Sequence, residues 1–353
     1  MGHVQRGGDF PVDGAGFDTG FMPQLLGVLG GTLQEALYAE GLAVLQQADL
    51  GHFMGQIVNV LTFGLYAPLL GDADQLPSVG PGAVLSEIIA CGAVPVVRLD
   101  RIFRQSYGSR IAANAKLIRH GNLSLEYGED FQFYDSCDMS ASAQQIETLY
   151  LQETARYGVD NVALLTPYRQ KTETGVNALN ERLREKLNPQ DGKKPEVAYR
   201  KRIYRLGDKV MQIKNCEDIS NGDIGYITSV TRDDTDSVLT VDFGDGRIAE
   251  YDGSDLEMLD LAYASTIHKS QGSEYKSVII NLQCAHAVML VRPLVYTAIT
   301  RAKERVLIVG ERRALCIAIK RADTEQRGTM LSARIKELIS NVKGDHYNGN
   351  LAQ

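Results

Sequence analysis

A glycine- and proline-rich loop over residues 71–82 is the first segment whose side chains could do chemistry. It reads GDADQLPSVGPG and follows an apolar stretch, residues 61–70, that we expect to be a strand. In α/β proteins, ligands bind in loops at the carboxyl ends of strands. Asp72, Asp74 and Gln75 are short polar side chains that suit a metal-bound phosphate or a water molecule beside it. A plain surface turn is the alternative, and the loop taken alone leaves both interpretations open.

A second segment, residues 262–274, is dense in hydroxyl, imidazole, ammonium and amide groups around one glycine, and reads AYASTIHKSQGSE. Such side chains, together with backbone amides, hold the phosphates of a nucleic-acid backbone without reading its sequence. A solvated loop is the alternative. The segment lies between two apolar stretches, however, and loops between core strands often carry function. We therefore favour a segment that faces phosphate or sugar.

Arg301 is the candidate residue in the third segment, which reads YTAITRAK over residues 296–303. We expect a helix over residues 290–303, leading into a strand from residue 305. An arginine fork binds a transferring γ-phosphate through two hydrogen bonds, and such a contact accelerates phosphoryl transfer by about 10³- to 10⁵-fold. Taken alone, an arginine of this kind is more often a surface ion-pair partner.

Positioning these segments requires a sheet covered by helices, and the hydrophobic pattern predicts one. Short β-branched runs predict strands, and apolar residues three and four apart predict helices between them. The expected strands are residues 94–99, 162–165, 277–282 and 305–310, and the expected helices are residues 83–91, 110–120, 143–157 and 175–187. This alternation is typical of an α/β fold with a parallel sheet.

The pattern changes between residues 205 and 261, where strands follow one another without helices. The expected strands are residues 209–213, 225–230, 238–243 and 247–251. A Gly-Asp-Gly turn at residues 244–246 predicts a hairpin between the last two strands. We therefore expect a small β-barrel-like insertion within the α/β domain.

The chain has 353 residues, with 37 Lys and Arg against 44 Asp and Glu, and a formal charge of −7. Residues 1–70 hold one basic and six acidic residues, so a net −5 lies in this segment and the rest of the chain carries −2. Binding to nucleic acid therefore needs a local basic surface. The five cysteines are odd in number and far apart, which predicts neither a disulfide framework nor a zinc cluster.

No stretch of the sequence is expected to cross a membrane. The longest apolar stretch, residues 57–70, is interrupted by Asn59, Gly64 and Pro68 and is shorter than the roughly 20 residues that a spanning helix needs. Acidic residues precede the first apolar patch, which is the wrong charge for a secretory signal. We therefore expect a cytoplasmic protein.

Taken in order, these segments resemble superfamily 1B DNA helicases of the RecD-like kind, the family that includes the exodeoxyribonuclease V alpha subunit. The resemblance runs from about residue 66 to residue 340 and includes FRQ at residues 103–105 and TPYRQ at residues 166–170. In that family, GDxxQLPSVGPG is motif III, FRQ carries the motif IV arginine, STIHKSQGSE is motif V and YTAITRA is motif VI. The implied fold is α/β: a RecA-like parallel-sheet domain (2A), an inserted SH3-like β-barrel (2B) and a remnant of domain 1A.

The resemblance implies roles for individual residues. Gln75 resembles the γ-phosphate sensor, and Arg104 and Arg301 resemble the two arginines that clamp the γ-phosphate. The implied nucleotide-binding positions are Gly71, Asp72, Gln75, Gly272, Glu274 and Arg301, and the implied DNA-binding positions are Thr266, His268, Lys269 and Ser270. In the complete family the cofactors are ATP and Mg²⁺, and the partner is single-stranded DNA.

The resemblance also implies a division of the chain. The expected parts are an atypical N-terminal segment at residues 1–65, a remnant of domain 1A with motif III at 66–92, the first part of domain 2A at 93–204, the SH3-like 2B insertion at 205–258, the second part of domain 2A at 259–345 and a tail at 346–353.

Two sequence elements of the family are missing. A P-loop needs GxxxxGK[ST], whose backbone amides and lysine hold the phosphates while its hydroxyl binds magnesium. The only Gly-Lys pair, at residues 192–193, is followed by Lys194, and no Asp-Glu pair occurs anywhere in the sequence. We therefore expect no metal ligands, no ATP held productively and no ATPase activity from this chain in isolation.

Three hypotheses follow. The first is the C-terminal portion of an ATP-dependent 5′ to 3′ DNA helicase, from a truncated or frame-shifted gene, with a divergent folded cap as the alternative for residues 1–70. The second is a non-catalytic single-stranded-DNA-binding or regulatory module derived from such a helicase. The third places the missing motor lobe on a separate polypeptide. Nucleotide turnover separates the first two hypotheses.

Overall fold

The structure is a computed structural model. It describes residues 71–77, 83–93, 96, 108–170, 172–200, 202–216, 218–232, 237–322, 330–337 and 340. The chain divides into two compact units, residues 1–71 and 72–353, and the fold described here is that of the second unit. The strand expected over residues 61–70 and nearly all of the one expected over residues 94–99 lie outside the described residues.

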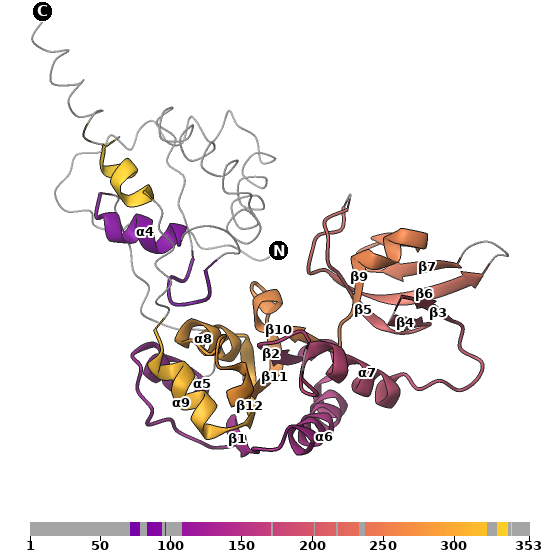
Figure 1. The fold of residues 1–353 in the computed structure, drawn as a ribbon, viewed down its shortest axis with the longest axis horizontal. Helices are drawn as coiled ribbons and strands as arrows, with labels where there is room; N and C mark the ends of the chain where they lie inside the picture. Colours follow the sequence, from indigo (N-terminus) through magenta and orange to yellow (C-terminus); the bar gives the residue numbers. More distant parts are fainter. Residues whose placement is uncertain are drawn as a thin grey trace, which may run out of the picture. The chain divides into compact units, whose positions relative to one another are not determined.

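A five-stranded parallel sheet is the main element of this unit (Figure 1). In spatial order its strands are β1 (Phe131–Asp135), β12 (Ala302–Gly310), β11 (Tyr275–Leu282), β2 (Val162–Thr166) and β10 (Ala264–Thr266). Strand β11 pairs in parallel with both β12 and β2, and its residues 277–282 are buried. Nearly continuous apolar sequence of this kind suits a strand that is covered on both faces. The expected parallel α/β fold is therefore confirmed.

Helices cover both faces of the sheet (Figure 1). Helices α5 (Arg110–Arg119), α8 (Arg292–Thr300) and α9 (Arg312–Lys320) share a hydrophobic cluster with one face, and α6 (Met139–Tyr157) and α7 (Val176–Leu187) share a cluster with the other. Ile280 and Leu165 lie in the first cluster, whereas their neighbours Ile279 and Leu164 lie in the second. This alternation follows from the period of two along a strand.

Several boundaries differ from the expected ones. Helix α6 begins at Met139, before the expected residue 143, because the Asp138 carboxylate caps it by accepting a hydrogen bond from the Ala141 N–H at 2.7 Å. The helix expected over residues 290–303 is wrong at both ends, since α8 ends at Thr300 and the chain enters β12 at Ala302. Helices α4 (Val84–Cys91), α5 and α7 begin and end within one residue of the expected positions.

An antiparallel sheet forms the insertion, in the spatial order β8-β7-β6-β5-β9. Its strands are β5 (Lys209–Gln212), β6 (Ile224–Arg232), β7 (Ser237–Asp242), β8 (Ile248–Asp252) and β9 (Leu259–Leu261). The expected hairpin joins β7 to β8, and Asp245 and Gly246 adopt positive φ angles of 55° and 77° in its turn. A preceding hairpin, β3 (Glu196–Tyr199) and β4 (Arg202–Arg205), contributes Val197 and Tyr204 to the hydrophobic cluster of this sheet.

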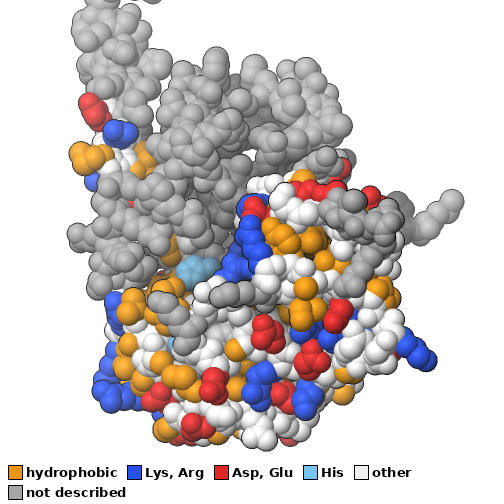
Figure 2. All heavy atoms as spheres, turned by 45° about the vertical axis from the view of Figure 1, so that its right-hand side comes forward, with side chains coloured by type: hydrophobic (Ala, Val, Ile, Leu, Met, Phe, Trp, Pro, Cys, Tyr) orange, Lys and Arg blue, Asp and Glu red, His pale blue; other side chains and the backbone are white. Residues whose placement is uncertain are grey.

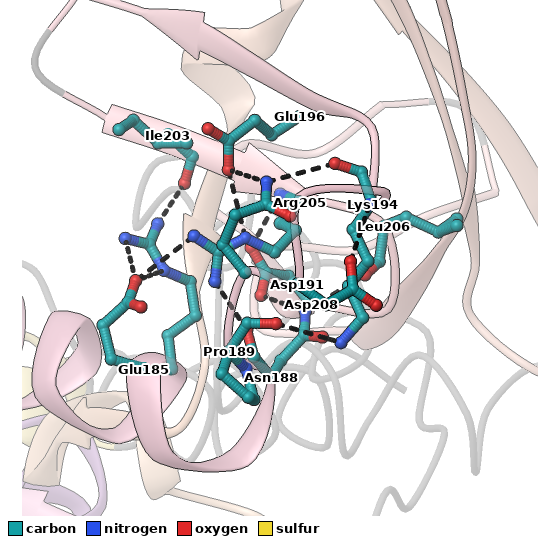
Figure 3. Close-up of polar contacts among 12 residues, drawn as sticks. Glu185, Asn188, Pro189, Asp191, Lys194, Glu196, Ile203, Arg205, Leu206 and Asp208 are labelled. Atoms are coloured by element: carbon teal, nitrogen blue, oxygen red, sulfur yellow. Dashed lines mark hydrogen bonds and ion pairs between the residues drawn. The ribbon is translucent and has the colours of Figure 1, made fainter.

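A buried polar network joins the end of α7 to the β3–β4 hairpin (Figure 3). The Arg205 residue is 4% exposed, and its guanidinium donates to the Asn188 carbonyl at 2.6 Å. The same guanidinium pairs with Glu196 at 3.1 Å and with Glu185 at 3.3 Å. Asp208 accepts hydrogen bonds from the Arg205 N–H and the Asn188 side chain, both at 2.8 Å. Because a buried charge needs such partners, this network fixes the hairpin on α7.

Candidate functional site

The Arg301 side chain brings together segments that are far apart in the sequence. Arg301 follows α8 directly and is 3% exposed. Its Nη2 donates to Gln75 Oε1 at 2.9 Å, and its Nη1 donates to the Ser273 carbonyl at 3.1 Å. Its Nε donates to the Thr297 carbonyl at 3.3 Å. The loop after residue 71, the segment after β10 and the end of α8 therefore meet at one guanidinium.

Two further hydrogen bonds hold the loop of residues 71–77 in this place. The Leu76 N–H donates to Thr297 Oγ1 at 2.8 Å, and Gln271 Nε2 donates to the Leu76 carbonyl at 2.6 Å. Leu76 itself is 8% exposed and packs in the cluster that includes α8. Sequence reasoning assigned no role to Thr297 or Gln271, although both lie inside the YTAITRA and STIHKSQGSE segments.

The acidic side chains of the loop contact protein groups. Asp72 accepts hydrogen bonds from the Asp74 N–H at 3.0 Å and from Gln75 Nε2 at 3.1 Å, so the Gln75 amide bridges Asp72 and Arg301. Asp74 pairs with Arg119 of α5 at 2.6 Å. Burial, and after it the negative charge of Asp72, raises the pKa of the Tyr296 hydroxyl. Gly71 is exposed at the start of this loop.

The positions implied to lie near a nucleotide differ in their contacts. Gly272 has a φ of 84°, the left-handed region that glycine tolerates best. The Ser273 carbonyl contacts Arg301, whereas the Glu274 carboxylate pairs with Lys303 at 2.9 Å. The second implied clamp arginine, Arg104, lies outside the described residues.

Of the four residues implied to contact DNA, Thr266 ends β10, and His268, Lys269 and Ser270 lie in the 3₁₀ turn η3 (Ile267–Ser270) that follows it. Thr266 and His268 are partly exposed. Lys269 Nζ donates to Asn221 Oδ1 of the insertion. Ser270 is 1% exposed and its hydroxyl donates to the Ile267 carbonyl at 2.8 Å, so the Ser270 side chain stabilises the turn and does not face solvent.

Electrostatics around Lys269 involve a pair of arginines that sequence reasoning did not single out. Burial, and after it the positive charge of Arg169, lowers the pKa of Lys269, whereas Asp260 raises it. Arg169 forms an ion pair with Asp260, and Arg202 pairs with the same carboxylate at 2.8 Å. The sequence signal for Arg169 was its place in the TPYRQ segment. Arg202 and Asp260 belong to no motif.

Within the described part of the chain, no three His, Cys, Asp or Glu side chains are grouped as a metal ion would require. No helix there has the length and apolar character needed to span a membrane.

Comparison with known proteins identifies the family. A sequence model described as "ATP-dependent RecD-like DNA helicase SH3 domain" matches residues 179–243, one described as "UvrD-like helicase C-terminal domain" matches residues 261–309, and one described as "AAA domain" matches residues 52–144. The ATP-dependent RecD2 DNA helicase of Deinococcus radiodurans is 36% identical over 270 residues, covering 76% of this chain. The chain belongs to the RecD-like superfamily 1B helicases. The resemblance seen in its motifs is thereby confirmed.

The RecD-like chain spans only part of its relatives. The match covers 36% of the Deinococcus protein. The RecBCD enzyme subunit RecD of Mycobacterium tuberculosis is 28% identical over 300 residues, covering 78% of this chain and 50% of that protein. A solved structure of Pif1 helicase from Bacteroides in complex with ADP-AlF3 and ssDNA is 19% identical, with a TM-score of 0.42, and the match covers 67% of this chain and 60% of that one.

Proposed function

We propose that this chain supplies the second RecA-like lobe of an ATP-dependent 5′ to 3′ DNA helicase. The observation that carries the proposal is the hydrogen bond of 2.9 Å between the buried Arg301 of motif VI and the partly exposed Gln75 of motif III. A guanidinium and an amide held side by side match the charge and hydrogen-bonding needs of a terminal phosphate. The Deinococcus relative is named an ATP-dependent DNA helicase, which agrees with this assignment.

Arg301 and Gln75 fit the terminal phosphate of ATP. Arg301 is oriented by the carbonyls of Ser273 and Thr297, so its fork is held in one geometry before any ligand arrives. Preorganised donors of this kind stabilise charge that develops during phosphoryl transfer. ATP, when bound, supplies the transferable phosphoryl group. The remaining phosphates and Mg²⁺ need a P-loop and an acidic pair, and the sequence contains neither GK[ST] nor Asp-Glu.

We therefore propose that this chain alone does not hydrolyse ATP and that a polypeptide carrying the first motor lobe is its partner. A second candidate is a single-stranded-DNA-binding or regulatory module without a motor. The contact of Lys269 with the insertion favours it, because this contact holds the turn after β10 through protein groups alone.

Both candidates place a single strand of DNA on the partly exposed Thr266 and His268. We choose a labelled oligothymidylate as the probe. Its affinity for the chain should fall steeply as the salt concentration is raised, because phosphate contacts release counterions. Fluorescence anisotropy measures the affinity as a function of salt. Replacing Thr266 or His268 by alanine should weaken binding without changing the thermal unfolding midpoint. Salt-independent binding, or none by the folded wild-type chain, contradicts the proposal.

A further inference from the structure

Asp260 stands between two arginines near the turn that carries Thr266 and His268. One carboxylate oxygen of Asp260 accepts a hydrogen bond from Arg169 Nη2, and the other forms an ion pair with Arg202 Nη2 at 2.8 Å. The side chains of Arg169 and Arg202 are 41% and 34% exposed, against 17% for Asp260. One carboxylate therefore holds two guanidinium groups at the surface.

The three residues come from three parts of the fold. Arg169 follows β2 of the parallel sheet, Arg202 begins β4, and Asp260 lies in β9, which leads from the insertion back to β10. Arg202 is also anchored by its Nη1, which donates to the Leu259 carbonyl at 2.6 Å. The cluster therefore lies where the insertion joins the RecA-like domain, and Asp260 is six residues before Thr266 in the sequence.

The cluster has an excess of positive charge. Lys269 is the third cation, since its pKa is lowered by burial and then by the charge of Arg169. Three cations thus share the single carboxylate of Asp260, in a chain whose formal charge is −7. Figure 2 shows Lys and Arg side chains that gather in a column near the middle of the face drawn. A second anion would relieve the repulsion among these three cations.

We propose that Arg169 and Arg202 bind a backbone phosphate of the single strand, and that Asp260 is a positioning residue that occupies their donors until the strand arrives. This inference rests on the proposed function. A carboxylate and a phosphate both pair with guanidinium N–H groups, and Asp260 contacts one Nη2 of each arginine, so it holds these two donors where a phosphate takes its place. DNA binding then exchanges one anion for another, and Asp260 lowers the affinity for DNA while it keeps both arginines ordered.

The test is Asp260→Asn, which removes the charge and keeps the shape of the side chain. Its affinity for labelled oligothymidylate should rise roughly fivefold at low salt, the equivalent of about 1 kcal/mol for an exposed ion pair that no longer has to be broken. Arg169→Ala should weaken binding by a similar factor and reduce the slope of log affinity against log salt by about one. When Arg169→Ala is combined with Asp260→Asn, the gain in affinity from Asp260→Asn should be smaller, because only one of the two released arginines remains.

Glu257→Gln is the matched control. Glu257 also lies in the insertion and also pairs with two cations, Lys214 at 2.7 Å and Arg200 at 3.3 Å, so this variant removes the same charge nearby. It should leave the affinity within about twofold of wild type, because Glu257 lies outside the proposed phosphate site and a charge that does not contact the strand acts on it weakly through salt solution.

Outcomes separate this inference from the proposed function. The proposed function stands if wild type binds the single strand and Thr266→Ala weakens that binding. The phosphate site is nevertheless refuted if Asp260→Asn has the same affinity as Glu257→Gln and Arg169→Ala has the same affinity as wild type. If no folded variant binds the single strand, both fall. Should Asp260→Asn fail to fold by circular dichroism, Arg169→Ala and Arg202→Ala decide the matter alone, and unchanged affinity in both overturns the phosphate site.

Discussion

Gln75 and Arg301 are separated by more than two hundred residues, and composition or periodicity alone cannot bring them together. The resemblance to RecD-like helicases implied that both act on one phosphate, and the structure places their side chains 2.9 Å apart. The resemblance did not predict that Arg301 is 3% exposed and held by the carbonyls of Ser273 and Thr297. Backbone acceptors have no sequence signature, so contacts of this kind become visible only in the fold.

His286 offers a residue-scale prediction that is independent of nucleotide and DNA. It is fully buried, its Nδ1 accepts from the Gln283 N–H at 3.3 Å, and its ring lies edge-on to Tyr168 at 5.3 Å. Burial lowers the pKa of His286 to about 4. The unfolded chain, with an ordinary histidine pKa of about 6.5, therefore binds a proton in a pH range where the folded chain does not.

The sign of the effect follows from this difference. Stability contributed by neutral His286 is complete above about pH 6.5 and is lost as the pH falls toward 4, by roughly 3 kcal/mol in total. Urea unfolding at pH 7.5 and pH 5 should show a smaller loss for His286→Gln than for wild type. A histidine NMR titration provides a second check, and a midpoint near 6.5 for His286 refutes the prediction.

At the scale of elements, most helices and the long strands of the RecA-like domain could be predicted from the sequence, whereas helix α9 was not among the expected helices. Helix α7 has apolar residues three and four apart, and strand β11 contains a continuous apolar run, so each pattern predicts its element. Strand β10 has three residues, too few for a recognisable period, and strand β1 reads FQFYD, without the continuous apolar run by which β2 was expected. Both are held by pairing with strands distant in sequence. The path from the insertion into β10 is likewise a tertiary feature.

Asn180 of α7 holds the chain between β9 and β10 in place, so replacing Asn180 should destabilise the fold. Its Nδ2 donates to the carbonyls of Leu261 and Ala264 at 2.9 and 3.1 Å, and its Oδ1 accepts from the Ala264 N–H at 2.7 Å. Asn180 is 2% exposed, so Asn180→Ala leaves buried backbone groups unpaired and should reduce the free energy of unfolding by about 2–4 kcal/mol.

Denaturant unfolding measures this loss, and amide hydrogen exchange should show faster exchange at Ala264. Asn177→Ala, on a partly exposed position of the same helix, is the control and should change stability by less than about 0.5 kcal/mol. Equal losses of stability in the two variants would mean that helix propensity, and not the contact of Asn180 with Leu261 and Ala264, decides the result.

At the scale of the whole molecule, the net charge of −7 means that DNA binding depends on a few local cations. The structure concentrates them where the insertion meets the parallel sheet, since Arg169, Arg202 and Lys269 come from different elements and surround one carboxylate. Arg202 lies in a basic run of the sequence, RKR at residues 200–202, whereas Arg169 and Lys269 are distant from it in the sequence. The fold therefore brings the three cations together around one carboxylate.

The whole chain is expected to show no DNA-stimulated ATP hydrolysis. Gln75 and Arg301 supply charge to a phosphate but have no amide cradle, and the 353 residues contain neither GK[ST] nor Asp-Glu to hold the rest of the nucleotide and its metal. Losing one transition-state donor costs about 10²- to 10³-fold in rate, and here a lysine, a hydroxyl and two acids are missing together. Because such groups act as a unit, the residues that remain do not compensate.

Phosphate release should be measured with and without single-stranded DNA, with Arg301→Ala as the control for contaminating ATPases. Turnover above about 1 s⁻¹, the low end for enzymes that transfer phosphate from ATP, that disappears in Arg301→Ala would refute the prediction and show that this chain contains a phosphate site without a P-loop sequence.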